Sequence, residues 1–177
     1  MIYVLLITPI LLGGLTFISF LKYFPNKWNY AIDRGYTFLK KPIFGKNKTI
    51  RGPIFMFFAV GLYGAMLDSL FPNVLSRPEN HFIIFMLFAL VGLCYSFGEL
   101  PNSFIKRRYG IKPGKMAIGM KRLFFNFVDT FDGITTSGIA YHFLFDIPID
   151  IIFVSIFIGG GIHLFTDFQM RRLELKK

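Results

Sequence analysis

The chain of 177 residues contains a single cysteine, Cys94, which lies in an apolar run. An internal disulfide needs two thiols and a cysteine-built zinc site needs at least two, so both are excluded. Charged residues are also scarce, at 17% of the chain, and no stretch rich in Pro, Gly and Ser separates two halves. These absences predict one domain over residues 1–177.

Acidic residues are the scarcer of the two charged kinds, with 10 Asp and Glu against 20 Lys and Arg, and the net charge is +10. Such basicity would suit a nucleic-acid partner, but 54% of the residues are hydrophobic and 24 are Phe. Several apolar runs approach or exceed the roughly 20 residues needed to cross a bilayer. The composition therefore predicts an all-α, polytopic integral membrane protein whose partner is the lipid bilayer and not a nucleic acid.

Five apolar segments are predicted to cross the membrane. The first is not expected to be a signal peptide, because it lacks a positive n-region and a small-residue cleavage motif. The predicted spans are Ile2–Leu21, Pro53–Leu70, His81–Phe97, about Asp129–Phe145, and Ile147–Phe165.

The positive charges are distributed very unevenly between the connections. The loop 22–52 holds eight Lys and Arg, the loop 98–122 holds seven and the tail 169–177 holds four, while only Arg77 falls on the opposite side. Positive residues concentrate in cytoplasmic loops. The pattern predicts an N-terminus outside, a C-terminus in the cytoplasm, and a site built from these loops that faces the cytoplasm at the cell membrane.

The longest strongly polar passage after residue 55 is Gly98–Lys115. Glu99 closes an apolar run, and a helix that begins at Pro101 would carry Ser103, Lys106 and Arg107 at i, i+3 and i+4 on one face. One hydroxyl and two cations beside an acid suit a phosphate group with its metal. A solvated basic loop that only anchors the protein is the alternative.

A second basic passage, Gly45–Gly52, directly precedes a predicted span. It offers three cations, Lys46, Lys48 and Arg51, and the hydroxyl of Thr49 between two glycines that allow close backbone approach. The following helix adds free N–H groups, so the passage suits phosphates. The spacing of a P-loop is absent. Ordinary positive charge at the end of a span is the alternative.

Two aspartates, Asp129 and Asp132, are spaced i, i+3 and are expected on one helix face at the cytoplasmic mouth of the fourth span. A charged residue deep in a membrane helix costs about 2.5–3.5 kcal/mol, and two carboxylates also repel. A compensating cation is therefore expected. Magnesium is one candidate, and Lys106, Arg107 or Arg51 are the alternatives.

Taken together, three stretches resemble one family. Gly45–Gly52 is similar to its loop after the first span, Gly98–Gly114 to its central loop with S-F-I-K-R-R and G-I-K-P-G, and Asp129-Thr-Phe-Asp132 to its D-x-x-D. The family is the CDP-archaeol synthases, small relatives of the CDP-diacylglycerol synthases (phosphatidate cytidylyltransferases). Its five-span layout and length also agree.

The chain departs from this family at three places. Position 99 is Glu where Asp is expected, Pro101-Asn102 replaces a more apolar pair, and the stretch between Gly114 and Asp129 is longer. These departures bear on whether the lipid is of the archaetidic or the phosphatidic acid type more than on the chemistry.

The resemblance implies a CTP-dependent cytidylyltransferase that converts a membrane lipid phosphate to a CDP-lipid and releases pyrophosphate. CTP and the lipid phosphate are the implied partners, Mg2+ the implied cofactor, and a homodimer is compatible. The implied metal ligands are Glu99, Asp129 and Asp132. The implied catalytic residues are Lys106, Arg107, Asp129 and Asp132. The implied substrate-binding residues are Lys46, Lys48, Thr49, Arg51, Ser103, Lys106 and Arg107.

Two other functions are considered. A CDP-alcohol phosphotransferase would carry D-G-x-x-A-R and distal aspartates, but Asp132-Gly133 is followed by Ile-Thr-Thr-Ser. A non-enzymatic scaffold or permease whose loops bind anionic lipid needs only bulk charge. In that case, exchanging Lys for Arg in the loops would be harmless.

The charge distribution generates a topological prediction. A reporter fused after Lys177 is expected in the cytoplasm, and one inserted near residues 72–79 is expected outside. Protease protection or reporter activity would locate each fusion. Both reporters on the same side of the membrane would contradict the five-span topology.

Overall fold

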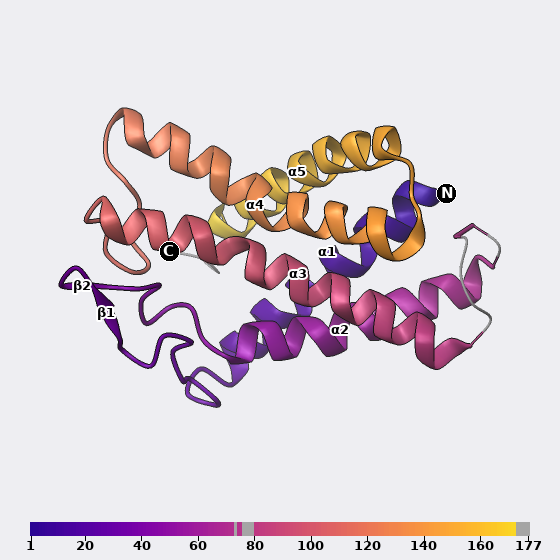
Figure 1. Ribbon diagram of the computed structural model, residues 1–177, viewed down its shortest axis with the longest axis horizontal. Helices are drawn as coiled ribbons and strands as arrows, with labels where there is room; N and C mark the ends of the chain where they lie inside the picture. Colours follow the sequence, from indigo (N-terminus) through magenta and orange to yellow (C-terminus); the bar gives the residue numbers. More distant parts are fainter. Residues whose placement is uncertain (73, 76–79, 173–177) are drawn as a thin grey trace.

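The computed structural model describes residues 1–72, 74–75 and 80–172, which form five helices and one short hairpin (Figure 1). The elements are α1 (Ile2–Tyr23), β1 (Thr37–Phe38), β2 (Lys41–Pro42), α2 (Arg51–Leu70), α3 (His81–Arg108), α4 (Met120–Phe145) and α5 (Ile149–Arg172). The all-α class is confirmed for the body of the protein. The two-stranded antiparallel hairpin lies in the first loop and was not predicted.

Four of the helices are long and apolar enough to cross a membrane: α1, α2, α3 and the segment Ile149–Thr166 of α5. The described residues thus support a membrane protein with four candidate spans. Helix α4 has the length, at 26 residues, but carries two aspartates and a hydroxyl-rich middle. A fifth crossing through α4 stays a prediction.

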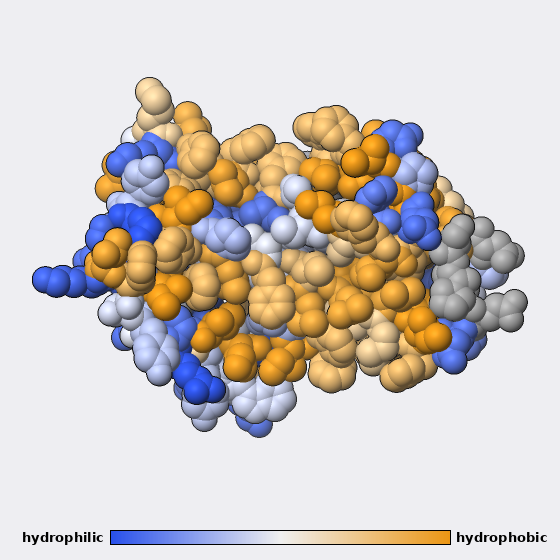
Figure 2. Space-filling view, viewed as in Figure 1, coloured by the Kyte–Doolittle hydropathy of each residue, from blue (hydrophilic) through white to orange (hydrophobic). Residues whose placement is uncertain are grey.

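The outer surface of the bundle has the character of a membrane protein. Figure 2 shows an apolar belt over the middle of the molecule, with hydrophilic residues gathered toward its two ends. Aromatic side chains on four different helices are more than half exposed: Phe58, Phe82, Phe143, Phe153 and Phe157. Contiguous apolar surface of this extent is unfavourable in water, and lipid chains remove that cost.

Helix α3 is longer than predicted. The expected helix start at Pro101 is wrong, because α3 continues unbroken to Arg108, and the end of the third span at Phe97 stays a prediction. Proline removes only one intrahelical donor, and membrane helices accommodate it where the freed backbone group finds other partners. The polar residues after Pro101 therefore extend directly from a membrane helix.

Helix α4 also differs from the prediction at its start. It begins at Met120, nine residues before Asp129, so the two aspartates lie within a helix, and their place at the cytoplasmic mouth of a fourth span stays a prediction. Both ends of the α3–α4 connection are thus helical, and the intervening loop covers only residues 109–119.

Close packing of α2 against α3 depends on glycine. A Cβ placed on Gly92 would lie 2.9 Å from the carbonyl carbon of Met56 and from Cβ of Val60, and one on Gly64 would lie 2.7 Å from Cβ of Phe88. Real Cβ atoms do not approach other heavy atoms this closely. Small residues bring membrane helices into backbone contact, and these glycines do so between α2 and α3.

The two long loops lie at the same end of the bundle. Figure 1 shows the hairpin loop and the α3–α4 connection together, with the N-terminus and the α4–α5 turn at the opposite end. This arrangement agrees with the predicted grouping of the loops. Arg77 and residues 173–177, which also entered the charge count, lie outside the described residues, and the orientation in the membrane stays a prediction.

The first loop is folded around the carboxylate of Asp33, which is 6% exposed. Its oxygens accept backbone N–H groups from Gly35 (3.1 Å), Phe44 (2.9 Å) and Gly45 (2.8 Å). Burial raises the pKa of this carboxyl, but the three donors stabilise its charged form, and the net pKa lies below the usual 3.8. Asp33 thereby fixes the start of the Gly45–Gly52 passage.

The helix packing generates a stability prediction. Gly92→Ala is expected to lower the melting temperature of the detergent-solubilised protein, because forcing a methyl group into a close helix contact costs about 1–3 kcal/mol. Gly161→Ala is the matched control, since no atom of the described residues lies within 4 Å of a Cβ at that position. Equal melting temperatures for the two variants would contradict the described contact.

The Asp33 contacts generate a second prediction. A carboxyl with a depressed pKa contributes stability above its usual pKa of 3.8 and loses it as the pH falls through the lower folded value. Asp33→Asn is expected to cost about 1.5–3 kcal/mol at neutral pH, the range for a hydrogen bond to a charged group. The difference in melting temperature from wild type is expected to shrink as the pH falls below 3.8. A difference in melting temperature that does not depend on pH would contradict the stabilising role of the charged Asp33 carboxylate.

Candidate functional site

Three polar side chains meet where α3 and α4 approach the loop end of the bundle. The side-chain Nδ2 of Asn102, on α3, donates to Oδ1 of Asp129 (2.7 Å) and to Oδ2 of Asp132 (2.9 Å), both on α4. Asn102 is only 5% exposed. The backbone N–H of Gly133 donates to the other oxygen of Asp132 at 2.7 Å. The two aspartates share one helix face, as their spacing predicts.

The two helices approach closely beside this cluster because glycines line the contact. A Cβ on Gly98 would lie 2.7 Å from Cγ2 of Thr136, and one on Gly133 would lie 2.9 Å from the ring of Tyr95. The hydroxyl of Thr136 also donates to the carbonyl of Cys94 across the interface, at 3.0 Å. Asn102 stands one helical turn after Gly98, so the register of this contact places it between the carboxylates.

Two lysines supply the positive charge that the carboxylates need. The ammonium of Lys106 contacts Asp129, and the ammonium of Lys48, from the first loop, contacts Glu99. Compensation of Asp129 by a protein cation was one predicted alternative, and Lys106 provides it. The Asp129 side chain remains 47% exposed, so the pair is accessible from the loop side.

The arginines predicted to bind phosphate donate to backbone carbonyls instead. Nη1 of Arg51 lies 2.7 Å from the carbonyl oxygen of Pro25 and 3.1 Å from that of Lys27. Arg107 is 4% exposed and donates to the carbonyl of Ile111. Both guanidinium groups thus hold loop segments against helix ends.

Arg108, which was not predicted, joins α3 to the hairpin. Its guanidinium donates to the carbonyls of Phe38, Lys41 and Pro42. It also stacks on the ring of Phe104, 4.9 Å from the ring centroid. The basic run of the sequence contained this residue, but no spacing rule distinguished its contacts from those of its neighbours.

The remaining predicted residues are dispersed. Lys46 is exposed on the loop surface, whereas Thr49 and Ser103 are 7% and 6% exposed. Thr49 forms an isolated bridge with Ala31. The structure therefore brings together Asn102, Lys106, Asp129 and Asp132 in one cluster and Lys48 with Glu99 in another contact.

The cluster fits a hard divalent cation in its donor chemistry. Asp129 and Asp132 present carboxylate oxygens around one buried amide, and magnesium is commonly held by one or two carboxylates plus substrate phosphates. Glu99 contacts Lys48, and within the described part of the chain no three His, Cys, Asp or Glu side chains lie close enough to hold a metal ion. The place of Glu99 as a third ligand stays a prediction.

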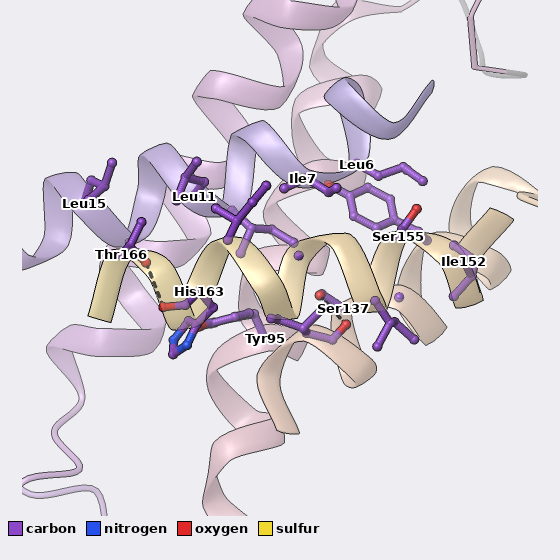
Figure 3. A pocket seen from close by; sticks show the side chains of 18 of the residues that line it. Leu6, Ile7, Leu11, Leu15, Tyr95, Ser137, Ile152, Ser155, His163 and Thr166 are labelled. Carbon is purple, nitrogen blue, oxygen red and sulfur yellow. Dashed lines mark hydrogen bonds between the residues drawn. The ribbon is translucent and has the colours of Figure 1, made fainter. Parts of the chain in front are cut away.

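A long groove runs between α1, α4 and α5, with a volume of about 810 Å3 including its open mouth. Figure 3 shows Leu6, Leu11 and Leu15 of α1 along one side and residues of α5 from Ile152 to Thr166 along the other. The lining is mainly aliphatic. The groove lies within the span region and is open at its side.

The serine hydroxyls of the groove are satisfied by their own helices, whereas the hydroxyl of Tyr141 is buried with no hydrogen-bond partner among the described residues. The hydroxyl of Ser137 donates to the carbonyl of Ile134, and that of Ser155 donates to the carbonyl of Ile151, each at 2.8 Å. Hydroxyls bonded back in this way present little polarity to a ligand. Tyr95 lines the same groove and packs against Gly133, the residue after Asp132. The groove is therefore apolar and adjoins the carboxylate cluster.

Comparisons with known proteins point to one family. The family model described as CarS-like, CDP-archaeol synthase, matches residues 3–177. The chain is 29% identical to a CDP-archaeol synthase of Archaeoglobus fulgidus over 157 residues, which is 82% of each chain. It is also 29% identical to a CDP-archaeol synthase of Staphylothermus marinus over 147 residues, which is 78% of this chain and 72% of that protein. No solved structure matches.

The family model spans nearly the whole chain, and the resemblance noted on three sequence stretches extends through every described helix. Two of those stretches, the central polar passage and the D-x-x-D, are the segments that α3 and α4 bring into contact around Asn102. The chain belongs to the CarS-like CDP-archaeol synthase family.

Proposed function

We propose that the protein transfers the cytidylyl group of CTP to the phosphate of a membrane lipid of the archaetidic acid type. An oxygen of the lipid phosphate forms a bond to the α-phosphorus of CTP, and the bond between that phosphorus and the bridging oxygen breaks. Pyrophosphate leaves with the electron pair, and the product is a CDP-lipid. The observation that carries this proposal is the cluster in which the buried Asn102 joins Asp129 and Asp132, within a family of CDP-archaeol synthases.

Electrostatic repulsion is the main obstacle to this reaction, because both substrates are polyanions. Two like unit charges about 4 Å apart repel by roughly 4 kcal/mol at an effective dielectric constant of 20. Most of the catalysis in phosphoryl transfer comes from positioning and charge stabilisation, and no protein nucleophile is required. The cluster lies at the end of the bundle where the basic loops gather, which suits this task.

The lysines are the residues best placed to exchange partners during the reaction. Lys106 and Lys48 are held by Asp129 and Glu99, and a lysine ammonium is a point charge on a flexible stem. When phosphates enter, these ammonium groups turn toward the phosphate oxygens and release their carboxylates. Asp129 and Asp132 would then hold Mg2+, which when bound neutralises phosphate charge.

The arginines contribute to the site by shaping it. Arg51 and Arg107 hold loop segments through backbone carbonyls, so in this proposal they order the walls around the phosphates. Lys46 is exposed and free to reach a phosphate from the loop surface. Thr49 and Ser103 are buried close to these segments and are proposed to act through backbone position rather than by direct contact.

The groove between α1, α4 and α5 is proposed to receive one hydrocarbon chain of the lipid. Its wall on α5 runs from Ile152 to Thr166, a rise of about 21 Å, which exceeds the roughly 15 Å depth of one bilayer leaflet. Tyr95 joins the groove to the backbone beside Asp132. A chain in this groove would bring the lipid phosphate to the carboxylate cluster, and the positive charge of the loops supports a cytoplasmic position for that end.

The proposal predicts a specific loss of turnover. Purified protein in liposomes is incubated with labelled CTP, Mg2+ and either archaetidic or phosphatidic acid, and the labelled CDP-lipid is measured. Asp132→Asn is expected to reduce the rate by about a hundredfold or more, the scale on which a charge-stabilising group acts.

Asp146→Asn is the matched control for this assay. Asp146 ends the same helix in the left-handed conformation and is exposed, and asparagine adopts that conformation readily. Full turnover is expected from this variant. Turnover near wild type in Asp132→Asn, or no labelled product with either lipid, would contradict the proposed function.

A further inference from the structure

The hydrogen bonding of the Asn102 side-chain amide is not explained by the proposed reaction. Both hydrogen-bond contacts of its NH2 group go to carboxylates, those of Asp129 and Asp132. Its carbonyl oxygen Oδ1 is buried and has no hydrogen-bond partner among the described residues. Buried polar atoms without a partner are rare in folded proteins, and each one calls for a physical reason.

The reason lies in the symmetry of the amide group. Rotation of the side-chain amide by 180° exchanges the positions of NH2 and oxygen with little change in shape. With no cation between the carboxylates, NH2 is the favourable end, because it donates to both. With a divalent cation there, the oxygen becomes the favourable end, because hard cations bind oxygen ligands.

We propose that Asn102 is a protein ligand of the divalent cation held by Asp129 and Asp132, contributing Oδ1 after its amide turns over. The same side chain then holds the two carboxylates together in the absence of the cation and completes their oxygen cage in its presence. The inference rests on the proposed function for the identity of the cation as Mg2+, but it concerns metal binding and is testable without CTP.

The surroundings favour Asn102 over the other oxygen ligands nearby. Glu99 is engaged with Lys48. Asn102 is already in contact with both aspartates and needs no backbone movement. Lys106 is the group that must leave Asp129, and its side chain lies at the edge of the cluster. Position 102 is also where the chain departs from the more apolar pair expected of the family, so the inference concerns this chain.

Direct binding of Mn2+, followed by electron paramagnetic resonance in the absence of nucleotide, tests the ligand assignment. Asn102→Ala is expected to weaken Mn2+ binding by about tenfold or more, the loss typical of removing a supporting group at a metal site. Asn102→Asp supplies a charged oxygen and is expected to bind Mn2+ more tightly than wild type. It is also expected to melt at a lower temperature in EDTA, because it replaces the NH2 group that bridges two carboxylates with a third carboxylate.

Asn29→Asp is the matched control, since it adds the same charge at an exposed position of the first loop and is expected to leave Mn2+ affinity unchanged. If Asn102→Asp binds Mn2+ no more tightly than this control, the proposal is wrong. That comparison remains decisive should Asn102→Ala fail to fold.

Counting the waters on the bound ion separates ligation from a purely structural effect. Tb3+ luminescence lifetimes in H2O and D2O report the number of inner-sphere waters. Asn102→Ala is expected to gain one water relative to wild type, whereas Asn102→Asp is expected to gain none. An unchanged count in Asn102→Ala would overturn the assignment. If the protein turns over CTP but the variants do not change Mn2+ affinity and the number of inner-sphere waters as expected, only the inference about Asn102 is rejected. If the variants change both quantities as expected but no CDP-lipid is formed, only the proposed function is rejected.

Discussion

Two neighbouring carboxylates on one face of a helix in an apolar bundle must be compensated, and much of the structure around α3 and α4 follows from that requirement. Asp129 and Asp132 would repel each other and resist burial. Asn102 bridges them and Lys106 contacts one of them. Because both partners stand on α3, that helix has to continue past Pro101, and glycines must let it approach α4. The cluster therefore depends on the close contact between two helices and not on a loop.

The cations of the loops fall into two groups with different physical behaviour. The arginines bind backbone carbonyls with a planar, rigid fork, as Arg51 and Arg108 do. The lysines Lys48 and Lys106 pair with carboxylates through a flexible stem. A guanidinium that bridges several carbonyls loses several hydrogen bonds by leaving, whereas a lysine ammonium is a point charge on a flexible stem and can exchange one oxygen partner for another. The arginines are thus suited to building the site and the lysines to meeting a substrate.

The sequence predicts the parts of this fold that depend on local patterns. Apolar length locates α1, α2 and α5, and the i, i+3 spacing places Asp129 and Asp132 on one face. Local rules failed where a tertiary contact decides the outcome. The sequence at Pro101 predicts a helix start, yet α3 is continuous through this residue, where it packs against α4. Asp33 and Asn102 were missed as site-forming residues, because an isolated polar residue reveals its role only through partners distant in the chain. The basic runs could not separate Arg107, which holds a carbonyl, from Lys106, which holds a carboxylate.

Helix α4 combines properties that a purely structural membrane helix would not need. Its first half presents Asp129 and Asp132 to α3, and its middle presents Ile134, Ser137 and Gly138 to the groove shared with α1 and α5. A span serving only as an anchor would be uniformly apolar, as α1 is. An enzyme that acts on a lipid headgroup must instead hold polyanionic phosphate and hydrocarbon within a few residues of each other. That demand accounts for the lower hydropathy of α4. Among the helices that the structure describes, α4 is the one that does not qualify as a candidate span.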